Sequence, residues 1–144
     1  MGSRIVALED HNKKVISYRR QLLCFVSPAG NNKIREWYQA LGPVEKATAD
    51  EFIKNMRRKR EWAMPDYRPS LRGKPGYRRL GELRWECNNV QHRLVGYFQD
   101  EAFAIMIGCT HKQQRYNPED ALETAVRRRK QVEGGEASLH EYDL

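Results

Sequence analysis

The sequence contains 144 residues, with 26 Lys or Arg against 19 Asp or Glu, so its formal net charge is +7. No apolar run approaches the roughly 20 residues of a membrane-spanning helix, and no secretory signal pattern opens the sequence. We therefore expect one soluble, cytoplasmic domain with a modest core of its own. The positive charge indicates an anionic partner, with nucleic acid as the first candidate and a membrane surface as the second.

The three cysteines do not predict a metal or disulfide site. Cys24, Cys87 and Cys109 lie in apolar, strand-like runs, and no two of them have the spacing of a zinc-binding pair. We expect all three to be small buried residues of the core. The sequence thus predicts no metal and no cofactor.

The first part of the chain predicts an extension, a strand and two helices. Residues 1–17 are polar and weakly patterned, and the apolar run at 19–27 predicts the first strand. A helical period follows and is ended by Gly42 and the proline after it. The second helix is expected to open at Thr48, where Thr-Ala-Asp-Glu fits a capping box. It ends in consecutive cations at 57–60, which suit a helix C-terminus better than a dedicated RNA contact.

Residues 65–81 combine loop-forming residues with cations and aromatic rings. Proteins bind single-stranded nucleic acid with positive charges that contact the phosphate backbone and aromatic rings that stack on the bases. Because the segment lacks a continuous apolar face, we expect no membrane partner. The predicted RNA-binding residues of this segment are Arg68, Arg72, Lys74, Tyr77, Arg78 and Arg79.

Residues 80–118 predict three consecutive antiparallel strands that lead into a helix. Asn88 and Asn89 form a two-residue turn signal between alternating runs, since Asn tolerates the left-handed conformation that such hairpins need. With these two residues as the loop, Arg84 lies directly opposite Arg93. The first hairpin therefore pairs two cations on one face of the sheet.

The third strand, expected at 103–109 after a four-residue loop at 99–102, extends this cationic face. On this register Arg93 lies opposite Gly108, and Lys112 follows on the same face. Tyr97 also falls on that face, whereas alternation turns His111 to the opposite side unless the strand has ended before it. His92 lies on the core side and is expected to be a packing residue.

The cationic face has two interpretations. Like charges placed opposite each other cost a few tenths up to about 1 kcal/mol unless an anion lies between them, so Arg84, Arg93 and Lys112 favour a phosphate site. Alternatively, Glu82 and Glu86 on the same face neutralise the arginines as a solvated ladder of ion pairs. The residues alone leave both interpretations open.

The end of the chain predicts one helix and a tail. Asn117 is expected to cap the helix, and Pro118 to occupy its first position, with acidic residues in the first turn. The amphipathic pattern continues to about residue 132. Residues 133–144 are expected to form an acidic flexible tail.

Two runs of this sequence, LGELRWECNNVQHRLVGYF and IMIGCTHKQQRYNPEDALETAVRRRK, together with the order of predicted elements, resemble the RelE/ParE toxin superfamily. The chain is most similar to the HigB-type, phage-derived branch, over residues 18–132. This resemblance implies an α+β, RelE-like fold with an N-terminal strand, two helices, a three-stranded antiparallel run and a C-terminal helix. The helices would pack on one face of a small twisted sheet.

The resemblance also implies a function. Enzymatic members are toxins of type II toxin-antitoxin systems and cleave mRNA in the A site of the 30S ribosomal subunit, by attack of the ribose 2'-OH on the adjacent phosphate. Their partner is a cognate antitoxin, usually a helix-turn-helix protein in this branch. By position, Arg84, Arg93 and Lys112 would contact the phosphate. The reaction also needs a base and an acid, for which the available groups are His92, His111, Tyr97 and Tyr116, and Tyr97 and His111 are the predicted ones. Arg115 and Tyr116 join the predicted RNA-binding residues.

This sequence departs from the family pattern in two places. Family members often have an aromatic residue where Thr110 stands and a second lysine where Gln113 stands. The usual C-terminal catalytic residue has no clear counterpart, with His140 and Tyr142 as candidates if the tail folds back. The alternative function is therefore a non-catalytic protein of the RelE fold that binds nucleic acid or poisons gyrase as ParE-type toxins do.

Overall fold

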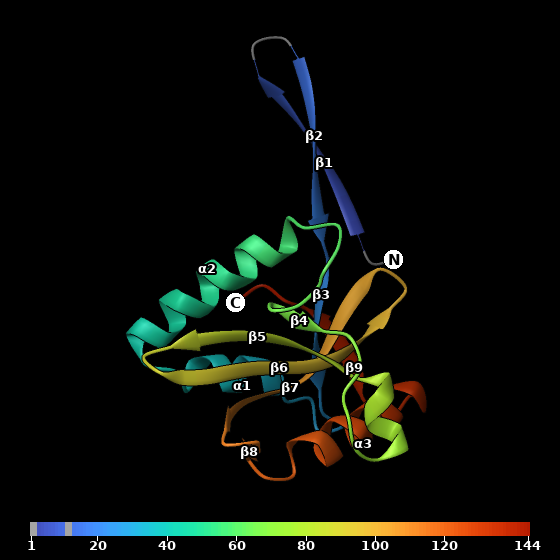
Figure 1. The fold of residues 1–144 in the computed structure, drawn as a ribbon. Coiled ribbons are helices and arrows are strands. Elements are labelled where there is room, and N and C mark those ends of the chain that lie inside the picture. Colours follow the sequence, from blue (N-terminus) through green and yellow to red (C-terminus); the bar gives the residue numbers. More distant parts are fainter. Residues whose placement is uncertain (1–2, 11–12) are drawn as a thin grey trace.

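The computed structural model describes residues 3–10 and 13–144 and has an α+β fold, with three α-helices and a mixed sheet in those residues (Figure 1). This fold class agrees with the sequence-based prediction. The strands are β1 (Ser3–Asp10), β2 (Lys13–Arg20), β3 (Leu22–Val26), β4 (Tyr67–Arg68), β5 (Gly81–Cys87), β6 (Val90–Gln99), β7 (Ala102–Lys112), β8 (Arg115–Asn117) and β9 (Ser138–Glu141). The helices are α1 (Lys33–Gln39), α2 (Pro43–Arg57), α3 (Ala121–Glu133) and the 3-10 helix η1 (Pro75–Arg79).

The main sheet is built around the predicted run of three antiparallel strands, β5, β6 and β7. Its strand order is β4-β5-β6-β7-β3-β9, and β8 pairs with the end of β7. Strand β3 is parallel to β7, with Leu22 opposite Phe103, and antiparallel to β9 on its other edge. The first strand of the predicted domain therefore lies in the interior of the sheet, as its continuous apolar run requires.

Strands β1 and β2 form a separate antiparallel ribbon that extends away from the sheet (Figure 1). The side chain of Arg20, the last residue of β2, fixes the base of this ribbon. It is 7% exposed and donates to the backbone oxygens of Glu101 and Arg60, each at 2.6 Å. Its guanidinium also lies 5.1 Å from the ring centroids of Trp62 and Phe98. The N-terminal extension predicted from the sequence thus contains a strand pair with a packed base.

Helices cover both faces of the sheet, and the prediction that they pack on one face is wrong. On one face, α1 and α2 pack against Leu83, Trp85 and Leu94. On the other face, α3 and η1 pack against Val95, Tyr97 and Ile107. The helical period of α3 specifies an apolar stripe but not the sheet face that receives it, so the sequence could not decide this point.

The starts of two helices differ from the predicted positions. Helix α2 begins at Pro43, with Gly42 as its N-cap and the Glu45 carboxylate accepting the Gly42 N–H at 3.1 Å. Proline is favoured at the first helical position, so Pro43 opens α2 and Thr48 lies inside it. Helix α3 begins at Ala121 rather than at Pro118, since residues 115–117 are taken up by pairing with β7.

The acidic end of the chain is ordered by pairing, in contrast to the predicted flexible tail. Strand β9 pairs with β3, with His140 opposite Cys24, and the next residue, Tyr142, is 5% exposed. An uncovered edge of β3 would leave its backbone N–H and C=O groups without partners. The tail supplies those partners. The three cysteines are free and buried, as predicted.

Candidate functional site

The turn between β5 and β6 sets the register of the candidate site. Asn88 and Asn89 both have positive φ angles, of 52° and 65°, as a two-residue hairpin loop needs. Arg84 lies opposite Arg93, so the predicted register of this hairpin is confirmed. His92 is 2% exposed and stacks on the Trp85 ring with centroids 5.6 Å apart, as expected for a packing residue.

A β-bulge between β6 and β7 changes the register of the third strand. Next to the loop, Phe98 lies opposite Phe103, but the register shifts between Val95 and Gly96. Beyond the shift, Arg93 lies opposite Cys109, so the predicted pairing with Gly108 is wrong by one residue. A shift of one residue moves every later side chain to the other face of the sheet.

Gly96 is the residue that permits this bulge. A Cβ atom at this position would lie 2.0 Å from the backbone oxygen of Ala104, which no side chain can tolerate. Glycine inside a strand marks bulges and close backbone approach, so Gly96 was the sequence signal for the shifted register.

The bulge exchanges the two residues at the end of β7. His111 lies opposite Gln91 and therefore on the face of Arg84 and Arg93, whereas Lys112 turns to the other face. The sequence-based prediction had these two residues the other way round. The His111 ring packs against Tyr116 of β8, with centroids 4.7 Å apart.

Glu82 neutralises the two arginines from within the protein. Its Oε1 atom lies 3.4 Å from Arg84 Nε and 3.5 Å from Arg93 Nε. The side chains of Glu82 and Arg93 are 3% and 4% exposed, and that of Arg84 is 22% exposed. Both interpretations of the sequence therefore differ from the structure. Arg84 and Arg93 do not form an open cationic face, and their ion pairs with Glu82 are buried rather than solvated. Arg93 is a buried cation held by a buried carboxylate, and only Arg84 reaches solvent.

Tyr116 completes the contacts of Glu82. Its hydroxyl donates to Glu82 Oε2 at 2.7 Å. Burial, the Glu82 charge and this hydrogen bond raise the pKa of Tyr116 far above its ordinary value. The phenol therefore stays protonated and acts as a structural donor.

His111 is poised to be neutral at physiological pH. Burial lowers its pKa, and the charges of Arg93 and Arg84 lower it further, while Glu82 opposes them. A neutral imidazole can accept a proton, so His111 meets the first requirement of a general base.

A pocket of about 290 Å³ opens beside His111, between the β5–β6 and β7–β8 turns. Lys112 and Arg115 lie opposite each other across the β7–β8 turn, and both are exposed. In the described part of the chain neither has an ion pair. Facing cations repel unless an anion lies between them. The pocket, called here the hairpin-end pocket, is lined by Asn89, Val90, Gln91, Thr110, His111, Lys112, Arg115, Tyr116 and Asn117.

In the basic segment at residues 65–81 most of the cations are exposed, but the aromatic rings are buried. Tyr77 is 9% exposed, and its hydroxyl donates to Glu123 of α3, so this ring cannot stack on a base. Tyr67 of the same segment is also buried. The cations Arg72, Lys74, Arg78 and Arg79 are exposed, and Arg68 is half-buried in β4.

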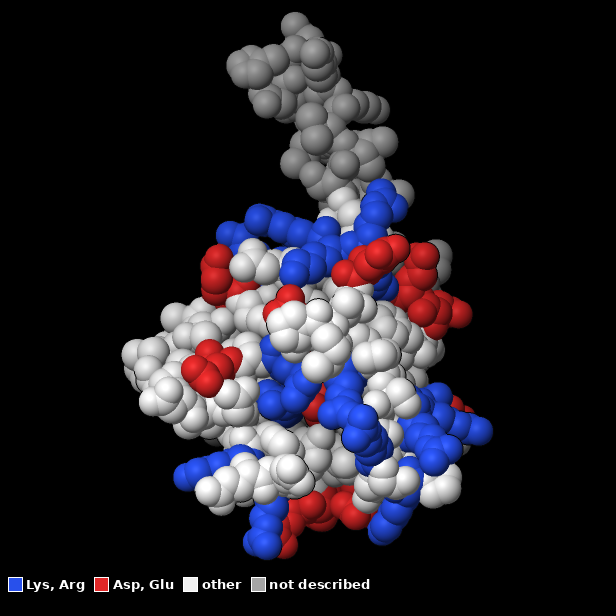
Figure 2. All heavy atoms as spheres, viewed as in Figure 1, with Lys and Arg blue, Asp and Glu red and all other residues white. Residues whose placement is uncertain are grey.

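Figure 2 shows the charge of this side of the molecule. Lys and Arg side chains gather over β5, β6 and η1, with small acidic areas between them. This arrangement is a positively charged surface interrupted by carboxylates, and it suits electrostatic contact with a phosphate backbone.

Tyr97 does not belong to the candidate site. It is 5% exposed, lies in the core under α3, and has the Arg129 guanidinium 4.1 Å from its ring centroid. Burial raises its pKa, which makes it a poor proton donor or acceptor near neutral pH. Its predicted place beside the phosphate is therefore wrong.

No family model, curated protein or solved structure matches this chain. Within residues 3–10 and 13–144, no helix is long and apolar enough to cross a membrane. The same residues contain no group of three or more His, Cys, Asp or Glu side chains that could hold a metal ion.

Proposed function

We propose that this protein is an RNA-cleaving toxin of the ribosome-dependent kind, acting at the hairpin-end pocket without a metal ion. The observation that carries the proposal is the β-bulge, because it brings the neutral His111 to the face of Arg84. The same pocket holds the facing cations Lys112 and Arg115. A base beside an unpaired group of cations is the set that 2'-OH attack on a phosphodiester requires.

The reaction would proceed by transfer of one proton and exchange of one bond to phosphorus. His111 accepts the proton of the ribose 2'-OH, and the 2'-oxygen attacks the neighbouring phosphorus. The bond from phosphorus to the 5'-oxygen breaks, and that oxygen takes a proton from water. The products are a 2',3'-cyclic phosphate and a free 5'-OH. Lys112 and Arg115, which line the same pocket as His111, neutralise the phosphate and stabilise the charge that develops on its oxygens.

Arg93 has a positioning role in this proposal. It is buried and pairs with the buried Glu82, so it orients Glu82, and its charge lowers the pKa of His111 and helps to keep that ring neutral. The RNA strand would continue from the pocket across the exposed cations of η1 and its neighbours, where phosphate contacts need no base sequence. The ribosomal mRNA substrate and the cognate antitoxin are proposed from the resemblance of the sequence to the RelE/ParE toxins.

The test is a translating extract in which mRNA ends are mapped after addition of the full chain. Wild-type protein should produce codon-phased cuts with cyclic phosphate ends. His111→Ala should lower the cleavage rate by about 100-fold or more, as expected for loss of a general base. A double variant, Lys112→Gln with Arg115→Gln, should also be impaired. The matched control, Arg127→Gln with Lys130→Gln on α3, removes the same charge and should cleave normally. Cleavage that survives His111→Ala would refute the assignment.

A second function is favoured by a specific observation, the neutralisation of both arginines by Glu82. With little free charge on the sheet face, the protein would bind nucleic acid without cutting it, or poison gyrase as ParE-type toxins do. Intact mRNA together with salt-dependent RNA binding would support the binding function. Loss of supercoiling activity of gyrase would support the other.

A further inference from the structure

The ribbon of β1 and β2 has no role in the cleavage proposed above. It holds eight residue pairs, from Ser3 opposite Arg20 to Asp10 opposite Lys13. Figure 1 shows that it projects from the rest of the protein, away from the main sheet. A single strand pair is marginally stable at best in water, and three or more strands with an apolar face are needed for independent stability. The ribbon would therefore gain stability from a further strand.

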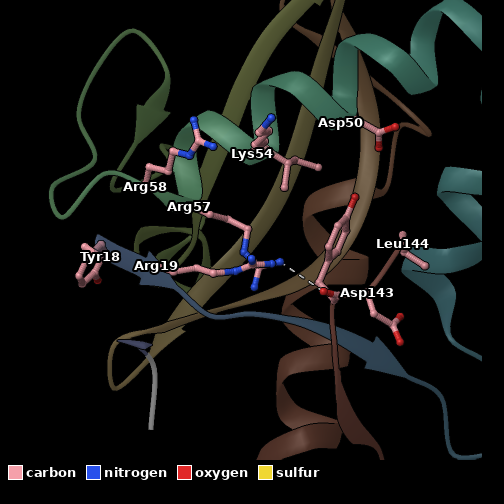
Figure 3. A pocket seen from close by; sticks show the side chains of 10 residues that line it. Tyr18, Arg19, Asp50, Lys54, Arg57, Arg58, Asp143 and Leu144 are labelled. Carbon is pink, nitrogen blue, oxygen red and sulfur yellow. Dashed lines mark hydrogen bonds between the residues drawn. The ribbon is translucent and has the colours of Figure 1, made fainter. Parts of the chain in front are cut away.

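The end of β2 is already held by the rest of the protein. Arg57 of α2 donates from Nε to the backbone oxygen of Arg20, the last residue of β2, at 3.1 Å. Figure 3 shows Tyr18 and Arg19 of β2 beside α2 and the end of the chain, around a cavity of about 560 Å³. Strand β1 pairs only with β2 in the part of the chain that the structure describes. Its outer edge is thus open to another strand, as unpaired strand edges are.

The sequence of β1 is complementary to itself when two copies run antiparallel. A twofold axis between two identical antiparallel strands sets one residue opposite its own copy, and the pairs on either side follow from it. With Ala7 on the axis, each end of the pairing holds one basic and one acidic residue, and its middle holds apolar pairs. Facing pairs of both kinds stabilise a sheet. The pairs are Arg4 with Asp10, Ile5 with Glu9, Val6 with Leu8 and Ala7 with itself.

Within its own ribbon Arg4 lies opposite a residue of the same charge. That residue is Arg19 of β2, and like charges at facing positions destabilise a strand pair. On the other side of Arg4, Asp10 of a second copy would supply the opposite charge. The other long twofold register, centred one residue earlier, sets Arg4 opposite Leu8 and leaves the repulsion in place. The charges therefore favour the first register.

The outer edge of β2 does not have this property. Strand β2 carries two cations at each end and no acidic residue, so both of its long twofold registers set cations opposite cations. Lysine on an exposed strand edge is one of the features by which proteins prevent unwanted pairing. Pairing of β1 with β2 of another copy would not close and would continue as a filament. The cations of β2 are Lys13, Lys14, Arg19 and Arg20.

We propose that β1 pairs with β1 of a second copy of this chain, so that the two ribbons form one four-stranded antiparallel sheet with Ala7 on the twofold axis. Mostly apolar residues then occupy the central positions of all four strands. Because the paired strands are antiparallel, the base of each ribbon lies beside the tip of the other. The ribbon is about 25 Å long, which keeps the two main sheets apart at opposite ends of the dimer. The inference is independent of the proposed cleavage, which uses none of these residues.

Charge reversal in the full chain tests this pairing. In sedimentation velocity, the wild-type protein should form a species of twice the chain mass of 17.0 kDa, and its fraction should rise with concentration over about 1–500 µM. Arg4→Glu should weaken the dimer by about tenfold or more, because it sets two acidic residues opposite each other at both ends of the pairing. The change also replaces the facing cations of one ribbon by an opposite-charge pair, so the ribbon itself should be kept. Arg127→Glu on α3 alters the net charge equally and should dimerise as wild type does.

Exchange of charge between two chains gives a stricter test. Asp10→Arg should also weaken the dimer, because it sets two basic residues opposite each other. A mixture of the Arg4→Glu chain and the Asp10→Arg chain should dimerise again, since each end then holds one acidic and one basic residue. This recovery is expected only if position 4 of one copy faces position 10 of the other.

A cysteine on the twofold axis tests the register. Facing Cα atoms of an antiparallel pair lie about 4.5–5.5 Å apart, within the range of a disulfide bond. Mild oxidation of Ala7→Cys should therefore join two chains, whereas Ser17→Cys, near the middle of β2, should join them far more slowly. The native cysteines Cys24, Cys87 and Cys109 are buried and should not contribute. A non-reducing gel measures both rates.

The proposal is wrong if the wild-type protein remains a monomer up to about 500 µM, or if Arg4→Glu and Arg127→Glu dimerise equally. It is also wrong if the mixed chains remain monomeric, or if Ser17→Cys joins chains as fast as Ala7→Cys, which would identify β2 as the pairing edge. Species that grow beyond two copies would identify the open pairing of β1 with β2 instead. Cleavage of mRNA should be normal in Arg4→Glu, and dimerisation should be normal in His111→Ala, so the two proposals can fail separately.

Discussion

Replacement of Glu82 by Gln is the most informative single change in this protein. Gln has nearly the same shape and can still accept the Tyr116 hydroxyl, so the substitution removes the negative charge alone. It leaves Arg93, which is 4% exposed, without the carboxylate 3.5 Å from its Nε. Removal of one partner of a buried ion pair costs about 3–5 kcal/mol, because the remaining charge stays buried and uncompensated.

We expect Glu82→Gln to lower the free energy of unfolding by about 3 kcal/mol at pH 7, the low end of that range, because Arg84 is partly exposed. At about 3 °C per kcal/mol for a chain of this size, the melting temperature should fall by about 10 °C. Urea denaturation followed by circular dichroism measures the first quantity, and a thermal scan measures the second.

Glu86→Gln is the matched control, since Glu86 lies on the same strand and face but is exposed, and its Oε1 accepts a hydrogen bond from Gln91 Nε2. Its effect should stay within about 0.5 kcal/mol. Sulfate should stabilise Glu82→Gln more than wild type, because an anion can replace the lost carboxylate. A Glu82→Gln protein as stable as the Glu86→Gln control would refute the view that Arg93 depends on Glu82.

Three further predictions concern acid sensitivity, the bulge and the first hairpin. Burial lowers the pKa of His92, so the unfolded chain binds more protons than the folded one below about pH 6.5. The free energy of unfolding should therefore decrease as the pH falls from 7 to 5, and His92→Phe should make this decrease shallower in urea titrations. Gly96→Ala should destabilise the protein by about 3 kcal/mol or more, or prevent folding, and a soluble variant with wild-type stability would contradict the bulge geometry. Asn89→Gly should raise the melting temperature slightly and Asn89→Val should lower it, because φ is 65° there; the same sign for both would contradict the turn.

The first hairpin was predictable because its information is local. Asn88 and Asn89 tolerate positive φ, and the alternating residues around them allow one register only. Every pair from Leu83 opposite Leu94 to Cys87 opposite Val90 follows from that turn. The position of Arg84 opposite Arg93 therefore follows from the sequence alone.

The bulge shows why the rest of the site was not predictable in the same way. The partner and the face of each strand residue are predicted by counting residues from the turn. One extra residue near Gly96 therefore moves every later side chain to the other face of the sheet. This reversal brought His111 to the candidate site and removed Lys112 from the predicted face. The pairing of Lys112 with Arg115 had no sequence signal either, since the Gln-Gln turn between them has none of the usual turn residues.

Composition also could not predict which charged side chains and which aromatic rings are buried. The predicted loop residues Tyr77 and Arg78 are neighbours in an aromatic and basic segment, yet one is core and the other is exposed. The difference depends on α3, whose Glu123 accepts the Tyr77 hydroxyl. Glu82 is similar, because its sequence position predicted a solvated carboxylate while packing on this face buries it.

The central place of β3 has a consequence for the synthesis of this protein. Residues 22–26 are synthesised well before both of their neighbours in the sheet, β7 and β9. A nascent chain therefore holds a wholly apolar segment that cannot form its hydrogen bonds until those strands have been made, and distant pairing of this kind slows folding. A ribosome stalled before residue 138 would display this segment with one edge unpaired, which is an aggregation-prone state.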